Sequence, residues 1–205
     1  MPPPRKRGKI YFTCPFSDIR YIRENTDAII VTAQAMESLK PGRGMGHLLP
    51  EALYEAGARA TFLNHAENPM TMTELAKTIA RARELGIETI ACADSLAEGT
   101  AIAAFHPDIL LCEPTDLIGT GRTADDSYTT SIVAKIRSID PTIAVMIASG
   151  ITTADDVYRV VRLGADGSGA TSGILNAPNP AERIMEMAEA IVRAAAVRES
   201  EESAA

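Results

Sequence analysis

Short apolar runs alternate with amphipathic segments along the whole chain. Seven runs have the length and apolar character of buried strands, over residues 9–15, 27–34, 60–65, 88–93, 109–113, 144–148 and 167–171. Segments with helical spacing or helix-boundary signals separate them. This alternation predicts a parallel sheet covered by helices.

Helix boundaries are marked by caps and glycines. Thr71 and Glu74 have capping-box spacing, and Gly86 follows the last apolar position of the helix they begin. Ser95 and Glu98 repeat the capping-box spacing. Further helices are predicted over 17–24, 50–56, 130–139, 152–163 and 181–197.

An open doubly wound sheet and a closed (β/α) barrel both agree with the alternation. The polar and glycine-rich positions come after strands, which favours a barrel with its active site at the carboxyl ends of the strands. The dinucleotide-binding pattern G-x-G-x-x-G is absent. Gly167 and Gly169 come closest to it, but Ser172 stands where the third glycine is needed.

The 205 residues suffice for one domain, predicted for 9–197 between disordered ends at 1–8 and 198–205. Their net charge of −7 disfavours a nucleic-acid or anionic-membrane partner. No apolar run approaches the roughly 20 residues that span a bilayer. The basic start of the chain has no signal-peptide core after it.

Three cysteines, Cys14, Cys92 and Cys112, stand within or just after apolar runs. They are an odd number without metal-ligand spacing. This pattern is typical of packed thiols in a reducing compartment, so we expect a cytoplasmic protein without a bound metal.

The stretch 110–121 ends an apolar run in a carboxylate, Glu113, followed by a stiff Pro114 and a glycine-rich finish at Gly119 and Gly121. A glutamate at the end of a buried strand, before such a loop, indicates a catalytic base under a hinged lid. An ordinary strand-to-helix loop whose glutamate faces solvent is the alternative.

Four longer motifs occur along the chain: Gly46-His47-Leu48-Leu49-Pro50, Leu63-Asn64-His65-Ala66-Glu67, Cys112-Glu113-Pro114 and Ser149-Gly150-Ile151-Thr152-Thr153. In sequence and in order they resemble the triosephosphate isomerase family in its archaeal-type short form. The resemblance implies a TIM (β/α) barrel that isomerises a small phosphorylated sugar, with no cofactor and no metal.

By this resemblance, Glu113 is the base that moves a proton between adjacent carbons, and His65 is the neutral imidazole that polarises the carbonyl, the roles for which this family is known. The chemistry needs both kinds of side chain: a base that removes a proton from a substrate carbon, and a hydrogen-bond donor that serves the substrate oxygens. The resemblance also implies phosphate binding by backbone N–H groups, at Gly119, Gly150, Ile151, Thr171, Ser172 and Gly173.

The sequence departs from the family near the catalytic lysine. The family's first strand ends in Asn-x-Lys, and no stretch here matches it, so we expect a barrel incomplete at the N-terminus, with the first βα unit and its lysine absent. Ala66, Asn68 and Met45 replace a serine, an arginine and a threonine. Loss of one positioned donor typically costs about 10²–10³ in rate, so we expect slower turnover than is usual in the family.

Two functions stay open. The leading one is aldose–ketose isomerisation of a small phosphorylated sugar through an enediolate. The alternative is a catalytically degraded paralogue that binds a phosphorylated ligand or a partner without turnover. A barrel without one strand has unpaired edges, and the family assembles through the loop that holds Met45, so we expect a homo-oligomer with Met45 buried in the contact.

Overall fold

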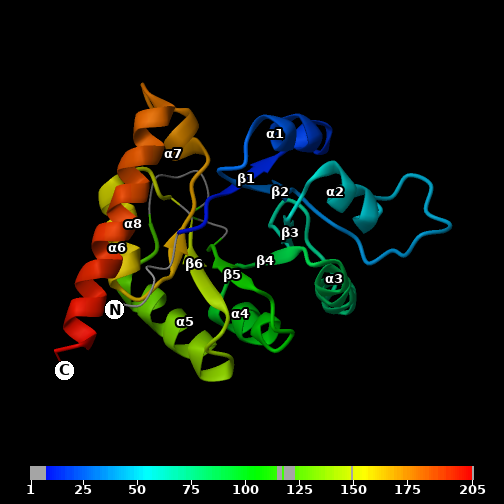
Figure 1. Ribbon diagram of the computed structural model, residues 1–205. Helices are drawn as coiled ribbons and strands as arrows, with labels where there is room; N and C mark the ends of the chain where they lie inside the picture. The colour runs from blue at the N-terminus through cyan, green and yellow to red at the C-terminus, as the bar shows by residue number, and fades with distance from the viewer. Residues whose placement is uncertain (1–7, 115–116, 118–122, 149, 205) are drawn as a thin grey trace. The chain divides into compact units, whose positions relative to one another are not determined.

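The computed structural model describes residues 8–114, 117, 123–148 and 150–204 (Figure 1). Its strands are β1 (Tyr11–Cys14), β2 (Ile30–Ala33), β3 (Ala60–Leu63), β4 (Glu88–Ala93), β5 (Ile109–Cys112), β6 (Ala144–Ile147) and β7 (Gly167–Ser168). Its helices are α1 (Ile19–Asn25), preceded by the 3-10 turn Phe16–Asp18, and α2 (Pro50–Ala56), α3 (Met72–Leu85), α4 (Leu96–Ala103), α5 (Asp126–Ile139), α6 (Ala154–Arg162), α7 (Ser172–Leu175) and α8 (Pro180–Glu202). Each of the seven predicted runs contains one of these strands.

The seven strands hydrogen-bond in the order in which they occur along the chain, β1-β2-β3-β4-β5-β6-β7. Tyr11 lies opposite Ile30, and Ile109 lies opposite Ala144, in parallel pairs. An open doubly wound sheet reverses its strand order at a switch point, and this sheet does not. The fold is therefore of the TIM type, as the sequence predicted, with seven strands in the described residues.

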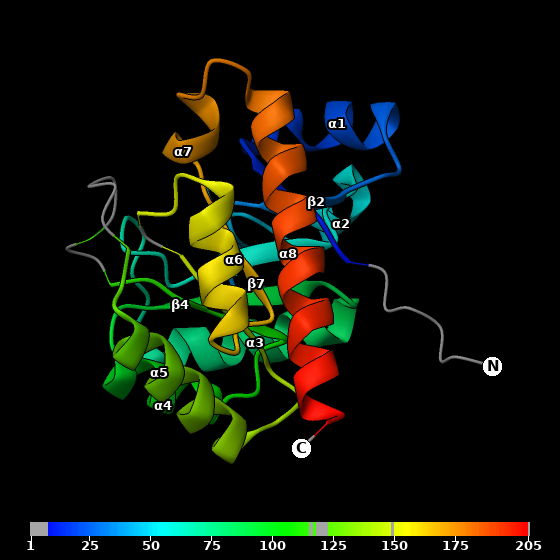
Figure 2. The same ribbon diagram turned by 90° about the vertical axis from the view of Figure 1, so that its left-hand side faces the viewer.

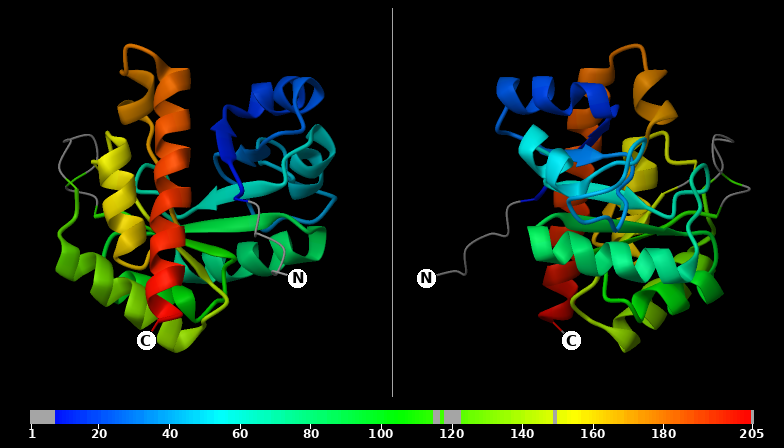
Figure 3. Two further views of the ribbon diagram at one scale, coloured as in Figure 1. Left: turned by 60° about the vertical axis from the view of Figure 1, so that its left-hand side comes forward. Right: turned by 90° about the vertical axis from the view of Figure 1, so that its right-hand side faces the viewer.

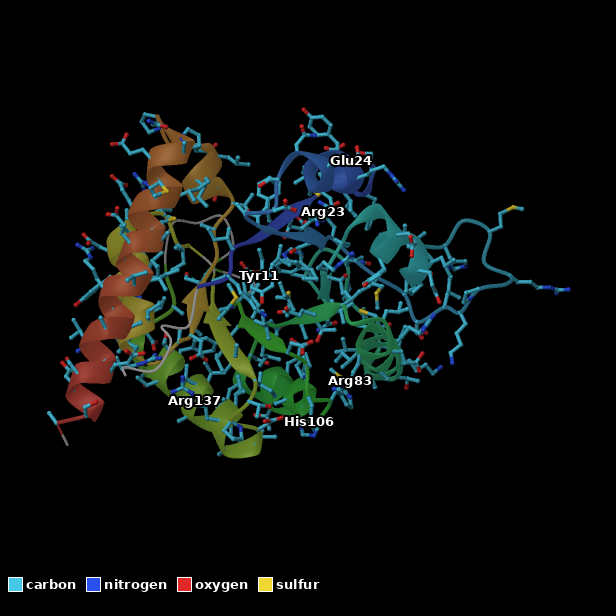
Figure 4. The ribbon with its side chains drawn as sticks, viewed as in Figure 1. Tyr11, Arg23, Glu24, Arg83, His106 and Arg137 are labelled. Atoms are coloured by element: carbon cyan, nitrogen blue, oxygen red, sulfur yellow. The ribbon has the colours of Figure 1, made fainter. Side chains whose placement is uncertain are left out.

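The described residues form two compact units. The first holds residues up to Asn64 and Asn68–Ile90, and the second holds His65–Glu67 and the chain from Ala91 onward. Val31 of β2, Leu63 of β3 and Leu75 of α3 are buried in the first unit. Tyr11 is labelled in Figure 4. Its hydroxyl donates to Glu88 Oε2 at 2.6 Å, which ties β1 to the start of β4.

The second unit is built on β5, β6 and β7. All four residues of β5 are buried, as expected for a parallel strand covered on both faces. Helix α8 runs alongside α6 (Figure 2; Figure 3, left). Val160 of α6 and the small Ala190 and Ala194 of α8 are completely buried, so the two helices pack closely.

Helix boundaries agree with the sequence where a cap marks them. The Thr71 hydroxyl accepts from the Glu74 N–H, and Gly86 ends α3 with a left-handed φ of 69°. Helix α5 begins at Asp126, four residues before the predicted start at 130, because Asp125 caps it by accepting from the Tyr128 N–H.

The C-terminal helix also differs from the sequence prediction. It was expected to end at 197, with a disordered tail over 198–205, but α8 continues to Glu202. Arg198 donates to the carbonyls of Val161 and Ala165, and Arg162 pairs with Glu201 at 2.8 Å. These contacts with α6 and the segment after it hold the last turns, so this part of the predicted tail is helical instead.

Candidate active site

The two predicted catalytic residues stand just beyond the ends of strands. Glu113 follows β5 directly, and its N–H donates to the carbonyl of Ala93 at 2.8 Å, which continues the sheet pairing past the end of the strand. His65 follows β3 after a single residue, Asn64. That residue has a left-handed φ of 56°, which asparagine tolerates better than most residues. The Asn64 Oδ1 accepts from the Met70 N–H at 2.9 Å and so fixes the turn that presents His65.

His65 and Glu113 face each other within the second unit. His65 Nε2 lies 3.7 Å from Glu113 Oε2, and the two side chains are 30% and 15% exposed. The separation is too long for a hydrogen bond. The pair is therefore close without being locked together, and both groups remain partly accessible.

The other ring nitrogen of His65 defines the tautomer. The Glu67 N–H donates to His65 Nδ1 at 3.2 Å. A nitrogen that accepts a hydrogen bond carries no proton, so in the neutral ring the proton is on Nε2. The imidazole thus presents an N–H donor on the side where the Glu113 carboxylate lies.

Buried thiols lie next to the carboxylate. Burial raises the pKa of the Cys112 thiol to about 12. The pKa of Cys92 is raised by burial first and then by the negative charge of Glu113. Both thiols are therefore protonated at neutral pH. All three cysteines are free and buried, as the sequence predicted.

A second cluster brings together two of the segments predicted to bind phosphate. A Cβ on Gly173 would lie 2.4 Å from the Ile151 carbonyl oxygen and 2.7 Å from Thr152 Cα, so the two backbones are in contact. Gly150 has a left-handed φ of 68°, and Ile151 is buried. The predicted residues at 150–151 and 172–173 are thus neighbours, as an anion nest requires.

The backbone donors in this cluster are in two different states. The N–H groups of Thr152 and Thr153 donate to Asp156 Oδ2 at 3.0 and 2.9 Å. Within the described part of the chain, no acceptor is found for the N–H groups of Ile151 and Gly173. The latter two are the donors that a phosphate could take.

Two further residues, Thr171 and Gly119, were predicted to bind phosphate. The Thr171 carbonyl accepts from the N–H groups of Ile174 and Leu175 and so begins the short helix α7. Gly119 lies outside the described residues. Among the residues that are described, no group of three or more His, Cys, Asp or Glu could hold a metal ion.

The sequence did not single out Arg183 or Asn64. Asn64 was only part of a motif, although a polar residue between a strand and a histidine is a signal for a fixed turn. Arg183 lies in α8, and its Nη1 donates to the Thr152 carbonyl beside the second cluster. No local pattern predicts that contact, because the two residues are 31 positions apart.

The chain is similar to known proteins over most of its length. The family model for triosephosphate isomerase matches residues 3–191. The triosephosphate isomerase of Methanocaldococcus jannaschii is 35% identical over 175 residues, which cover 84% of this chain and 80% of that protein. That of Sulfurisphaera tokodaii is 36% identical, over 77% of this chain and 69% of its own length. The triosephosphate isomerase of Sulfolobus acidocaldarius is 34% identical, over 87% of this chain and 77% of its own length.

Proposed function

Because this chain belongs to the triosephosphate isomerase family, we propose that it interconverts the aldose and ketose forms of a small phosphorylated sugar through an enediolate. The three relatives described above are named triosephosphate isomerase, which supports an isomerase function. A degraded paralogue that only binds a ligand is not favoured by these matches.

The main support for this proposal is that the side chains of His65 and Glu113 face each other. A Glu113 carboxylate takes a proton from the carbon next to the substrate carbonyl. The His65 Nε2–H donates to the carbonyl oxygen and stabilises the charge that develops there. Return of the proton to the neighbouring carbon, with transfer of the hydroxyl proton from one oxygen to the other through His65 Nε2, completes the isomerisation. Glu113 and His65 therefore both end the cycle in the protonation state in which they began.

Phosphate binding belongs to the second cluster in this proposal. The N–H groups of Ile151 and Gly173, with those of Gly150, Thr171 and Ser172, form the nest. Gly119, which lies outside the described residues, is assigned to the same phosphate site by the family resemblance alone. Backbone donors bind an oxyanion without a cofactor. The nest and the His65–Glu113 pair are both built on residues that follow strands, which is where this fold places its active sites.

The location and assembly of the protein are also part of the proposal. The free, buried cysteines support a cytoplasmic location. In the described part of the chain, no helix is long and apolar enough to cross a membrane. We propose a homo-oligomer that assembles through the loop of Gly44, Met45 and Gly46, where the Met45 side chain is fully exposed.

Solvent-deuterium incorporation into dihydroxyacetone phosphate tests the catalytic assignment, since it registers proton abstraction even when turnover is slow. Glu113→Gln keeps the shape of the side chain and removes its basicity. We expect exchange to fall by at least about 10³-fold, with binding of 2-phosphoglycolate largely retained. Glu189→Gln, an exposed position on α8, is the matched control. Equal exchange in Glu113→Gln and the parent would remove Glu113 from the mechanism.

A further inference from the structure

Arg183 lies in the first turns of α8, with its side chain three-quarters buried beside the second cluster. Its Nη1 donates to the backbone carbonyl of Thr152. Its Nε lies 3.3 Å from Glu186 Oε2, one turn further along the same helix. The guanidinium thus joins α8 to the loop after β6.

That loop is held from the opposite side by Asp156. Oδ2 of Asp156 accepts from the Thr152 N–H at 3.0 Å and from the Thr153 N–H at 2.9 Å. The hydroxyls of the two threonines donate to the same oxygen, at 3.2 and 2.8 Å. These hydrogen bonds keep the pKa of the Asp156 carboxyl below its ordinary value although burial opposes them, so it is ionised at neutral pH.

Two consecutive peptide groups are fixed in this way. The peptide that joins Thr152 to Thr153 is bound at both ends, its carbonyl by Arg183 and its N–H by Asp156. The preceding peptide joins Ile151 to Thr152. Its N–H, that of Thr152, donates to Asp156, and its carbonyl, that of Ile151, packs against Gly173. The next N–H toward the N-terminus belongs to Ile151, and it is the one left for a ligand.

We propose that Arg183 is a positioning residue for phosphate binding, which acts by holding the Thr152 carbonyl so that the Ile151 and Gly173 N–H groups converge on one phosphate. This inference rests on the proposed function of the same cluster. Arg183 need not touch the phosphate, since its hydrogen bond is made to the backbone of the loop. A donor preorganised in this way binds without first paying for the ordering of its loop.

The test compares Arg183→Met and Arg183→Lys with Arg193→Met. The methionine keeps most of the apolar stem but donates no hydrogen bond. The lysine keeps a charged donor. Arg193 lies on the same helix, is exposed, and sits over the Tyr158 ring at 5.7 Å, so its loss removes the same charge away from the loop.

We expect Arg183→Met to weaken 2-phosphoglycolate binding, measured by calorimetry, about tenfold, the usual effect of one charge-assisted hydrogen bond. Glycolate, which lacks the phosphate, should bind the variant and the parent equally. KM for the phosphorylated substrate should rise by a similar factor while kcat changes less than about twofold. Arg183→Lys should recover most of the affinity, and Arg193→Met should match the parent.

Three results would overturn the inference. Unchanged 2-phosphoglycolate affinity in Arg183→Met, with a parent that binds it, would refute the role of Arg183 and leave the proposed function intact. A parallel loss of kcat, glycolate binding and melting temperature, without recovery by lysine, would show a structural role only. A parent that neither binds 2-phosphoglycolate nor exchanges deuterium would refute the proposed function and this inference together.

Discussion

At the scale of single residues, the candidate site depends on backbone groups as much as on side chains. His65 is useful because the Glu67 N–H occupies its Nδ1, which leaves the proton on Nε2. In the proposed phosphate site, Ile151 and Gly173 contribute N–H groups alone. A substitution that changes no functional side chain can therefore still damage the site.

Gly173 offers a direct test of this view. A Cβ at this position would overlap the Ile151 carbonyl oxygen and Thr152 Cα, which are backbone atoms that cannot rotate away. We expect even Gly173→Ala to separate the two segments and to weaken 2-phosphoglycolate binding by more than about tenfold, and the bulkier Gly173→Val to weaken it further.

Gly169→Ala is the matched control, because its Cβ would meet only the end of Met146, at 3.9 Å. Calorimetric titration with 2-phosphoglycolate measures the affinity of each variant and of the parent. Affinity that is unchanged in Gly173→Val would place the phosphate elsewhere.

Residue patterns indicated the His65–Glu113 pair more readily than they indicated the residues around it. Glu113 and His65 were predicted from the ends of apolar runs and from motifs, and the structure brings them within 3.7 Å. Arg183 could not be predicted, because its contact with Thr152 exists only once α8 packs beside the loop. Sequence spacing describes neighbours along an element but not partners across the fold.

At the scale of elements, most boundaries follow from local chemistry. Thr71 and Gly86 fix α3 through a side-chain cap and a left-handed glycine. Helix α7 was not predicted, because four residues at Ser172–Leu175 are too few to show a helical period. Asp125 was an available cap signal for α5 that the apolar spacing alone did not use.

The end of α5 leads to a prediction about acid stability. Asp140, the residue after the helix, accepts from the Thr142 hydroxyl and N–H at 2.6 and 2.8 Å, and its Oδ2 lies 2.6 Å from His106 Nδ1. His106 is labelled in Figure 4. These bonds, the Thr142 hydroxyl and then His106 first, lower the pKa of the Asp140 carboxyl to about 2.

A lowered pKa in the folded state stabilises the protein at pH values above the unfolded-state pKa of about 4. The contribution is lost as the pH falls from about 4 toward about 2, when the folded carboxyl also takes up a proton. We therefore expect Asp140→Asn to be less stable than the parent at pH 6, with the gap narrowing as the pH is lowered to 3.

Urea unfolding at several pH values measures this gap. Asp155→Asn, an exposed position near the start of α6, controls for the loss of one charge. A gap that does not change between pH 6 and pH 3 would show that Asp140 gains nothing from its ionised form in the fold.

At the scale of the whole molecule, strand order identifies the fold and assembly is the open question. The parallel order without a reversal excludes the doubly wound alternative that the sequence alone left possible. Sequence periodicity could not separate the two, because both architectures need the same buried parallel strands. The exposed loop between β2 and α2 is the feature that bears on assembly.

Met45 at the tip of that loop is fully exposed, although it is a large apolar side chain. The loop around it has a defined shape. The His47 N–H donates to the Gly44 carbonyl at 3.0 Å, Gly46 has a left-handed φ of 85°, and His47 Nδ1 lies 2.8 Å from Glu37 Oε2. A shaped loop that presents an apolar tip suits insertion into a second copy of the chain, because burying the tip gains hydrophobic free energy without first ordering the loop.

We expect the parent to be at least a dimer at micromolar concentration and Met45→Asp to be a monomer, because a carboxylate at the tip would have to be buried without a partner. Light scattering with size separation measures both masses against the 21.8 kDa of one chain. Met72→Asp is the control, since Met72 is also an exposed apolar residue but begins α3 outside the loop. A folded parent that runs as a monomer would refute the assembly proposal. A dimer that survives Met45→Asp would place the contact on another surface, because the loop would then contribute nothing that the charge could disrupt.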